Sequence, residues 1–154
     1  MEKEQKLQAL QKLAHRLNAA GIPWAVGGSM LLYFKGLVSE FRDIDIMVKA
    51  EDAEPVRAIL EKLGTLEAPK PSVKFQSKAF FELTIDGVDV DVMAGFVIIS
   101  GGAAHDCSLQ EQEITESIQL GSENIPLHSL AAWRRNYELM GKHDKVRLID
   151  ENLL

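Results

Sequence analysis

The segment AFFELTIDGVDVDVM, residues 79–93, predicts a β-hairpin at the centre of the fold. Asp86-Gly87 is a favoured two-residue type I′ turn, and apolar residues alternate with polar ones on both sides of it. The turn sets a register in which Glu82 lies opposite Asp91. The apolar side chains then face a core, and the polar side chains share the other face of the hairpin: Glu82, Thr84, Asp89 and Asp91.

Two upstream segments predict strands that bring further polar groups to this sheet. Trp24-Ala25-Val26 is a short buried strand that runs into Gly27-Gly28-Ser29, where a helix begins. Glycines let a ligand approach the backbone closely, and the N–H groups at a helix start attract anions. Arg42 to Val48 alternates so that Asp43 and Asp45 project to one side, about 7 Å apart along the strand. A turn suited to phosphate therefore comes shortly before a carboxylate pair suited to a hard cation.

The remaining periodic segments predict helices and a second strand pair. The expected helices cover residues 3–19, 30–34, 53–63, 130–140 and 144–152, and the expected strands cover 114–120 and 125–127. The apolar run Val92 to Ile99 is interpreted as one buried strand. Trp24 and Trp133 are expected to pack in the core rather than to stack on a base.

This order of elements predicts an α/β (α+β) fold. We expect a mixed β-sheet with helices mainly on one face and an open acidic face. The sequence contains no repeat and no linker, so residues 1–154 are expected to form a single domain. Its core would lie at about 21–95, and its C-terminal strand pair and helices at about 113–154.

Composition limits the partners. The 154 residues include 17 Lys and Arg against 23 Asp and Glu, a net charge of −6. Such a surface repels long polyphosphate chains, so no binding to bulk nucleic acid is expected. No stretch approaches the ~20 apolar residues of a membrane span, and the lone Cys107 gives no internal disulfide. With a charged N-terminus that lacks an apolar signal core, we expect a cytoplasmic protein with no membrane association.

Acidic side chains would crowd the polar face of the sheet. Glu82, Asp89 and Asp91 share the hairpin face, and Asp43 and Asp45 join them from a neighbouring strand. Like charges opposite one another destabilise a sheet. A bound divalent cation would remove that cost. Compensation by a Lys or Arg of the C-terminal helices, or simple solvation of an edge strand, are the alternatives.

Taken together, these features resemble the nucleotidyltransferase superfamily related to DNA polymerase β. The resemblance rests on Gly27-Gly28-Ser29, thirteen intervening residues, Asp43-Ile44-Asp45 and a third acid on a later strand. It covers about residues 21–95 and extends to small stand-alone bacterial proteins that share Ile85-Asp86-Gly87 and Ile125-Pro126. The superfamily includes lincosamide and aminoglycoside nucleotidyltransferases and members of toxin–antitoxin pairs. The resemblance therefore implies a nucleotidyltransferase-like sheet.

The resemblance also implies a nucleotide-binding set. Gly28 and Ser29 match the turn that holds the triphosphate, and Gly27 is the glycine that precedes it. Relatives often bring basic side chains towards the nucleotide from the segment that contains Lys142 and Lys145. A solvated helix end, where cations are favoured by the helix dipole, is the alternative for these two lysines.

Catalysis and metal binding are implied for three carboxylates. Asp43 and Asp45 match the metal-binding pair, and Asp91 best matches the third acid, with Asp89 on the same face as the runner-up. In the implied reaction, one Mg²⁺ (or Mn²⁺) held by Asp43 and Asp45 bridges the phosphates. A second ion, held also by Asp91, activates an acceptor hydroxyl for attack on the α-phosphorus.

Two functions follow as hypotheses. The leading one is a metal-dependent nucleotidyltransferase that moves an NMP group from an NTP to an unknown hydroxyl acceptor, either a small molecule or a macromolecule. The alternative is a non-catalytic or regulatory nucleotide-binding module of the same fold, such as a toxin–antitoxin partner. Many antibiotic-modifying relatives carry a larger C-terminal substrate domain, which is not expected within these 154 residues, and this leaves the acceptor open. A homodimer, or a partner chain that completes the pocket, is compatible with both hypotheses.

Overall fold

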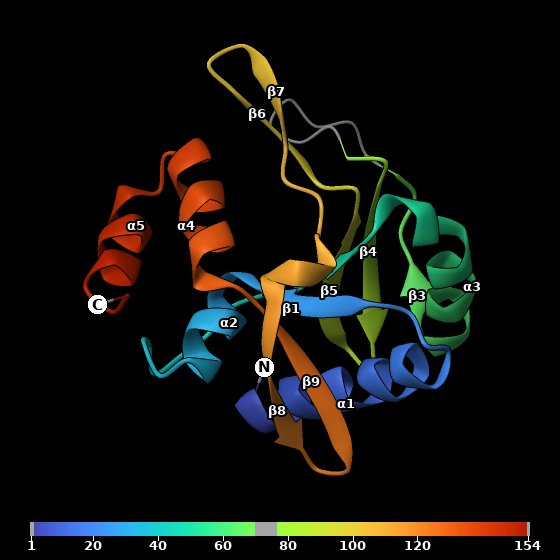
Figure 1. Ribbon diagram of the computed structural model, residues 1–154. Helices are drawn as coiled ribbons and strands as arrows, with labels where there is room; N and C mark the ends of the chain where they lie inside the picture. The colour runs from blue at the N-terminus through green and yellow to red at the C-terminus, as the bar shows by residue number, and fades with distance from the viewer. Residues whose placement is uncertain (1, 70–76, 154) are drawn as a thin grey trace.

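A seven-stranded sheet organises the chain, of which the computed structural model describes residues 2–69 and 77–153. The strand order is β3-β4-β5-β2-β1-β9-β8 (Figure 1). A separate two-stranded sheet pairs β6 with β7. The strands are β1 (Trp24–Gly27), β2 (Ile44–Val48), β3 (Thr65–Leu66), β4 (Ala79–Ile85), β5 (Val88–Ala94), β6 (Val97–Ser100), β7 (Ala103–Asp106), β8 (Ile114–Leu120) and β9 (Glu123–His128).

The large sheet is mixed. Strand β2 runs parallel to β5, and β1 runs parallel to β9. The other pairs in the sheet are antiparallel, including β1 with β2 and β4 with β5. The expected mixed α/β fold is thus confirmed, and β2 lies at the middle of the strand order, between β5 and β1.

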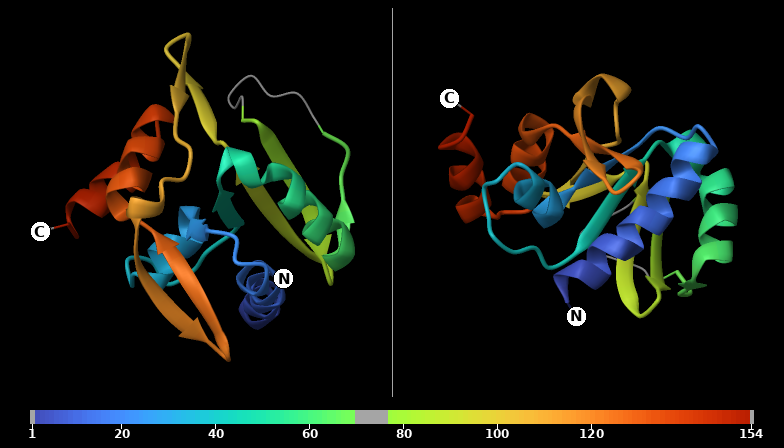
Figure 2. Two further views of the ribbon diagram at one scale, coloured as in Figure 1. Left: turned by 45° about the vertical axis from the view of Figure 1, so that its right-hand side comes forward. Right: turned by 90° about the horizontal axis from the view of Figure 1, so that it is seen from below.

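Helices surround this sheet. They are α1 (Lys3–Ala19), α2 (Gly28–Phe34), α3 (Ala53–Leu63), α4 (Leu130–Leu139) and α5 (His143–Asp150), with short 3₁₀ turns η1 (Ala50–Asp52) and η2 (Glu111–Glu113). Helices α1 and α3 pack on each other and on the sheet. Figure 1 shows α4 and α5 on the opposite side of the molecule from α3, and Figure 2 shows the same separation from two further directions. Helix α4 reaches both α2 and β6, so it closes the end of the sheet where β1 passes into α2.

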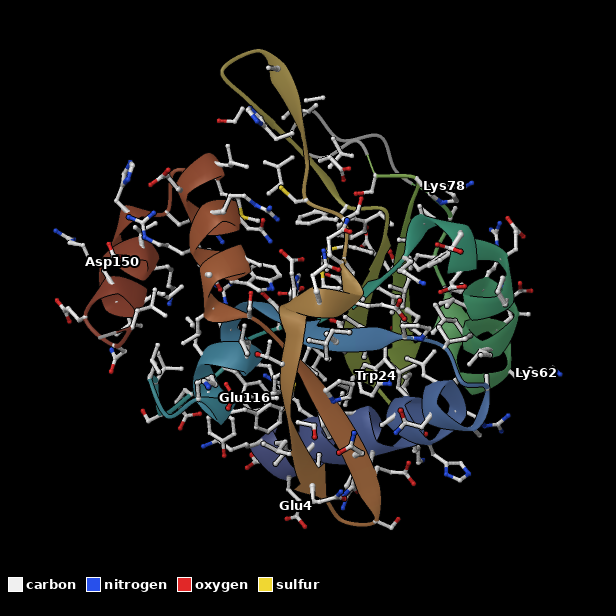
Figure 3. All side chains as sticks on the ribbon, viewed as in Figure 1. Glu4, Trp24, Lys62, Lys78, Glu116 and Asp150 are labelled. Carbon is white, nitrogen blue, oxygen red and sulfur yellow. The ribbon has the colours of Figure 1, made fainter. Side chains whose placement is uncertain are left out.

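The core lies between the helices and the sheet. Leu10, Leu13 and Leu17 of α1 are fully buried, as their helical spacing predicts. Trp24 is 1% exposed, and Figure 3 shows it within the body of the molecule while Lys62 points away from it. Trp133 is 2% exposed, so both tryptophans pack in the core as expected. Within the described residues, no helix combines the length and the apolar character needed to cross a membrane.

The central hairpin adopts the register predicted from its turn. Asp86 and Gly87 have φ angles of 51° and 81°, the positive values that a type I′ turn requires at both central positions. Glu82 pairs with Asp91, and Thr84 pairs with Asp89. The polar face of β4 and β5 is therefore the one that the sequence indicates.

The interpretation of Val92 to Ile99 as one strand is wrong. Strand β5 ends at Ala94, and Gly95 has a φ angle of +62°, which breaks the extended chain. The chain then forms the β6–β7 hairpin around Gly101 and Gly102, at the top of the molecule in Figure 1. Periodicity does not detect this break because the residues on both sides of Gly95 are apolar.

Candidate active site

A single register row crosses four strands and carries most of the predicted chemistry. Asp45 of β2 pairs with Asp91 of β5 on one side and with Gly27 of β1 on the other. Asp91 in turn pairs with Glu82 of β4. Neighbouring strands lie about 4.8 Å apart, so three carboxylates occupy adjacent positions on one face. We call Glu82, Asp91, Asp45 and Gly27 the inner row.

Two further acids lie one row away on the same face. Asp89 comes two residues before Asp91 and accepts a hydrogen bond from the Thr84 hydroxyl at 3.3 Å. Asp43 comes two residues before Asp45, just ahead of the first residue of β2. Both side chains are exposed, whereas Asp45 and Asp91 are half-buried. We call Thr84, Asp89 and Asp43 the outer row.

Asp45 and Asp91 of the inner row line a cleft of about 280 Å³, which we call the main cleft. Asp43, Asp45 and Asp91 all line it, so the structure brings the three predicted metal and catalytic residues together. Gly28 and Ser29 line the same cleft, as do Lys142 and Lys145. The other lining residues are Arg42, Phe80, Met93, Phe96, Trp133, Tyr137 and Met140.

A smaller pocket of about 240 Å³ lies beside the main cleft, and we call it the acidic pocket. It is lined by Asp43, Glu67, Glu82, Leu83, Asp89 and Asp91. Asp43 and Asp91 line both cavities. Asp89, the runner-up for the third metal ligand, lines only the acidic pocket. The acidic side chains therefore extend from the main cleft into a second binding space.

Burial and mutual repulsion perturb the inner-row carboxylates. Burial raises the pKa of Asp45 from 3.8 to about 7, with further increases from the charges of Asp91 and Asp43, while Lys142 acts in the opposite direction. Burial also raises the pKa of Asp91 to about 6, assisted by the charge of Glu82. Groups whose pKa is raised in this way are typical of functional clefts.

Glycine is required at position 28 because of its backbone conformation and its closeness to Asp45 of the inner row. Its φ angle is +61°, and a Cβ at this position would lie 2.2 Å from Oδ2 of Asp45. Any other residue would therefore be strained and would displace the Asp45 carboxylate. The helix expected at residues 30–34 begins earlier, at Gly28, as α2. The Ser29 hydroxyl accepts a hydrogen bond from the Arg42 backbone N–H at 3.2 Å. This bond ties the glycine turn to the segment that leads into β2.

Gly27 has a different neighbour. A Cβ at Gly27 would lie 2.3 Å from Cζ2 of Trp133, so the indole ring occupies the space that a side chain would need. Gly27 itself does not line the main cleft, while the Trp133 ring does. The two glycines thus face different groups, the indole of α4 at Gly27 and the carboxylate of β2 at Gly28.

Cationic side chains line the main cleft together with the carboxylates. Lys142 is the N-cap residue of α5, and its charge offsets part of the rise that burial causes in the pKa of Asp45. Its Nζ atom lies 5.9 Å from the centre of the Tyr137 ring. Lys145 follows in the first turn of α5, and Arg42 comes from the segment before β2. The pattern of alternation predicts that Arg42 turns away from Asp43 and Asp45, yet it lines the same cleft because it precedes the first residue of the strand.

The donor set fits a hard divalent cation. Carboxylate oxygens are the ligands that Mg²⁺ and Mn²⁺ prefer. Such a cation would stabilise the ionised forms of Asp45 and Asp91, which burial and, to a smaller extent, mutual repulsion disfavour. As the side chains stand, no group of three His, Cys, Asp or Glu within residues 2–69 and 77–153 is arranged to hold a metal ion. The residues that would hold a metal ion are Asp43, Asp45 and Asp91, because they are carboxylates that line the same cleft.

Sequence reasoning missed two contributors. Glu67 follows β3, and its backbone N–H donates to the Glu82 carbonyl at 2.9 Å, which brings its carboxylate to the acidic pocket. No local pattern marks Glu67, because β3 is only two residues long. Trp133 was assigned to the core, and its contact with Gly27 depends on the packing of α4 against the end of β1. The available signal is Gly27, since a glycine is also required where a large side chain packs directly on the backbone.

Comparison with known families agrees with this geometry. Residues 9–151 match the family model for aminoglycoside-2''-adenylyltransferase, so the chain belongs to that family of nucleotidyltransferases and is an enzyme of this class. No curated protein matches the chain significantly in sequence.

Solved structures of nucleotidyltransferases share the fold. TM1012 from Thermotoga maritima, described as a candidate nucleotidyltransferase, is 26% identical over 99% of this chain and 95% of its own, with a TM-score of 0.76. ANT(2'')-Ia, solved with adenylyl-2''-tobramycin, is 15% identical over 97% and 90% of the two chains, with a TM-score of 0.68. The lincosamide adenylyltransferase LnuA, solved with lincomycin, is 14% identical over 93% and 95%, with a TM-score of 0.61. At such low identities, the latter two likenesses establish the fold alone.

Proposed function

We propose that this single-domain protein is a divalent-metal-dependent nucleotidyltransferase that moves an NMP group from an NTP to a hydroxyl of a small, positively charged acceptor. The observation that carries the proposal is the inner row, in which Asp45 and Asp91 are register partners beside the turn at Gly28. Membership of an adenylyltransferase family supports the same reaction and favours ATP as the donor.

The cationic side of the main cleft is assigned to the triphosphate. Arg42, Lys142 and Lys145 supply positive charge, and the Ser29 hydroxyl supplies a hydrogen-bond donor. Phosphoryl transfer depends on in-line positioning and charge neutralisation rather than on covalent chemistry by the protein. These groups would hold the phosphates with the α-phosphorus near the inner row.

Asp43, Asp45 and Asp91 would hold the metal ions. Bound Mg²⁺ or Mn²⁺ supplies neutralisation of the developing phosphate charge and activation of the acceptor hydroxyl. Asp91 lines both the main cleft and the acidic pocket, which supports a role for it between the proposed donor and acceptor sites. Because Asp91 also lines the proposed acceptor pocket, it is the carboxylate that would accept the proton of the attacking hydroxyl.

The acidic pocket is assigned to the acceptor. Glu67, Glu82 and Asp89 add negative charge beyond the carboxylates of the main cleft. Such a pocket attracts amino groups and steers cationic molecules towards the site. The structure of ANT(2'')-Ia with adenylyl-2''-tobramycin provides an acceptor of this kind, so an amino-substituted sugar is the proposed substrate class.

Pyrophosphate release tests this proposal. Purified protein is incubated with ATP, GTP or CTP and Mg²⁺ or Mn²⁺, with tobramycin as a cationic acceptor and lincomycin as a less basic one, and the products are identified by mass spectrometry. We expect metal-dependent pyrophosphate release and an adenylylated aminoglycoside. The Asp45→Asn variant, which keeps the side-chain shape, serves as the inactive control.

The same assay separates the regulatory alternative. A protein that binds Mg·ATP but releases no pyrophosphate with any acceptor would be a nucleotide-binding module rather than a transferase. Ligand present at 100 times its Kd raises the free energy of unfolding by about 2.7 kcal/mol, which a thermal-shift assay detects. Absence of any shift with Mg·ATP, together with absence of turnover, would contradict the proposed site itself.

A further inference from the structure

A chain of hydrogen bonds leads through His128 to the wall of the main cleft. His128 is the last residue of β9 and is 2% exposed. Its Nε2 atom lies 3.1 Å from Oε1 of Glu113, and its Nδ1 atom lies 3.0 Å from Nε1 of Trp133. A buried imidazole with a partner on each ring nitrogen is held in a single orientation.

The partners define the proton positions on this imidazole. The indole N–H of Trp133 is only a donor, so Nδ1 of His128 must accept from it. Nε2 then carries the proton and donates to the Glu113 carboxylate. Burial lowers the pKa of His128, with Glu113 acting to raise it and the Arg135 charge acting to lower it, in agreement with a neutral ring.

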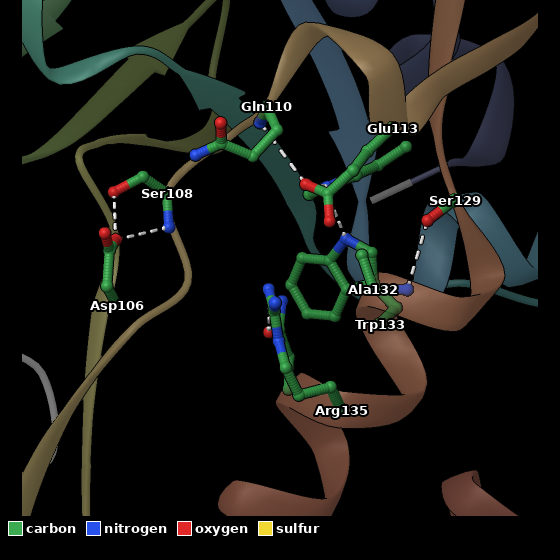
Figure 4. Close-up of polar contacts among 10 residues, drawn as sticks. Asp106, Ser108, Gln110, Glu113, Ser129, Ala132, Trp133 and Arg135 are labelled. Carbon is green, nitrogen blue, oxygen red and sulfur yellow. Dashed lines mark hydrogen bonds and ion pairs between the residues drawn. The ribbon is translucent and has the colours of Figure 1, made fainter.

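Glu113 is itself anchored. It is the last residue of η2, and its Oε1 atom also accepts from the Gln110 backbone N–H at 3.2 Å (Figure 4). The carboxylate is therefore fixed at the segment that follows the β6–β7 hairpin. From there the chain of bonds passes through His128 to the indole of α4.

The Trp133 indole backs the glycine turn. Its ring occupies the place of a side chain at Gly27, and it stacks on Phe96 with ring centres 6.5 Å apart. The next residue, Gly28, contacts the Asp45 carboxylate. A rotation of the indole would therefore be transmitted through two residues of backbone to the inner row.

We propose that His128 is a positioning residue for nucleotidyl transfer, which holds the Trp133 indole against Gly27 and thereby fixes Gly28 beside Asp45. The proposal rests on the proposed function for the identity of the reaction. It assigns to His128 no contact with substrate, because the side chain is buried behind the indole.

Two amide substitutions, each of which reproduces the position of one ring nitrogen, separate the two bonds of His128. In His128→Asn the carbonyl oxygen is attached to Cγ, as Nδ1 is in histidine, so the acceptor for the Trp133 N–H is kept and the bond to Glu113 is lost. In His128→Gln the amide lies one atom further out, near the place of Nε2, so the bond to Glu113 is kept and the acceptor for Trp133 is lost. A purely structural role predicts similar damage from both variants.

The readouts are the emission of Trp133 and the binding and turnover of Mg·ATP. In a Trp24→Phe background Trp133 is the sole tryptophan. We expect His128→Gln to shift the Trp133 emission to longer wavelength and to weaken Mg·ATP binding, measured by calorimetry, or to lower kcat, by about tenfold. His128→Asn should retain the wild-type emission and stay within about twofold in both measurements.

Gly27→Ala provides an independent route to the same displacement. The new methyl group would push the indole away, so this variant should reproduce the emission shift and the loss of Mg·ATP binding or kcat seen for His128→Gln. Adding Trp133→Phe, which removes the ring atoms in contact, should restore part of the stability lost in Gly27→Ala.

The outcomes are distinguishable. Equal losses in His128→Asn and His128→Gln that follow their loss of stability, or an unchanged Trp133 emission in His128→Gln, would overturn the positioning role. If the wild-type protein binds no Mg·ATP, the proposed function fails, and with it a role of His128 in transfer. The emission of the variants then shows whether His128 orients the indole at all.

Discussion

The inner and outer rows both carry aspartates on the same sheet face, yet these aspartates differ in environment. In the inner row, Asp45 and Asp91 are register partners on parallel strands and are half-buried. In the outer row, Asp89 is exposed and accepts a hydrogen bond from Thr84. The segments at β2 and β5 both have the sequence Asp-x-Asp, so the sequence motif alone does not distinguish an inner-row aspartate from an outer-row one.

The difference shows what converts a polar strand face into a site. Helix α4 and the glycine turn cover the inner row from one side, which removes water from Asp45 and raises its pKa to about 7. Asp43 and Asp89 of the outer row line the acidic pocket and stay exposed to solvent. Carboxylates acquire raised pKa values where neighbouring elements bury them. The following predictions test this difference between the two rows.

The largest expected effect separates Asp91 from Asp89. Because we propose that Asp45 and Asp91 hold the metal ions, Asp45→Asn or Asp91→Asn should lower kcat by about 10³-fold. Asp89→Asn, the matched change one row away, should leave kcat within about threefold. Steady-state pyrophosphate release at saturating Mg·ATP measures both. Equal losses in Asp89→Asn and Asp91→Asn would remove the distinction between the rows.

Stability against pH provides the second test. The pKa of Asp45 is raised from 3.8 to about 7 in the folded protein, so the folded state binds protons more tightly than the unfolded chain between these values. This contribution to stability is fully present below about pH 4 and is lost as the pH rises through about 7. Without divalent ions, Asp45→Asn should therefore be more stable than wild type at about pH 8, by on the order of 2 kcal/mol.

Urea unfolding in the presence of a chelator checks this expectation. At about pH 5 the advantage of Asp45→Asn should fall to less than half, and it should disappear only below about pH 4, where the carboxyl is protonated in the folded and the unfolded protein. Asp89→Asn serves as the exposed control and should change stability by no more than about 0.5 kcal/mol at either pH. A gain for Asp89→Asn equal to that for Asp45→Asn would show that general charge repulsion, and not burial of the inner row, is responsible.

The smallest expected effect belongs to the acidic pocket. Glu67→Gln combined with Asp89→Asn should raise the KM for a cationic acceptor by about tenfold, because each exposed charge contributes only modestly. The kcat and the KM for Mg·ATP should stay the same, and the effect should diminish at high salt. Kinetics with tobramycin at two ionic strengths measure this. A rise in the KM for Mg·ATP instead would place the nucleotide, not the acceptor, in the acidic pocket.

Local chemistry explains what could be predicted from the sequence. The Asp86-Gly87 turn dictates its own strand register, and the structure confirms the pairing of Glu82 with Asp91. The Ser129 cap of α4 is equally local, and its hydroxyl accepts from the Ala132 N–H at 3.1 Å. The family resemblance rested on such short motifs and is confirmed by the match to residues 9–151.

Long-range packing explains what could not be predicted. The parallel pairing of β2 with β5 joins residues that are 46 positions apart, Asp45 and Asp91, and no local signal specifies it. The contact between Gly27 and Trp133 spans the chain in the same way. Gly95 was read as part of a strand because its neighbours are apolar, although its positive φ angle ends β5. The roles assigned to the site residues stay predictions until the variants are measured.

The buried carboxylate at Asp45 has a consequence for how such proteins can change over generations. Replacing Asp45 with a neutral residue is expected to raise the free energy of unfolding of the metal-free protein and to abolish nucleotidyl transfer. Random mutation at this position therefore favours stable but inactive variants. Only selection for the catalysed reaction opposes the loss of this carboxylate. Inactive homologues of the same fold, retained only for binding, can therefore arise from an active ancestor by one substitution.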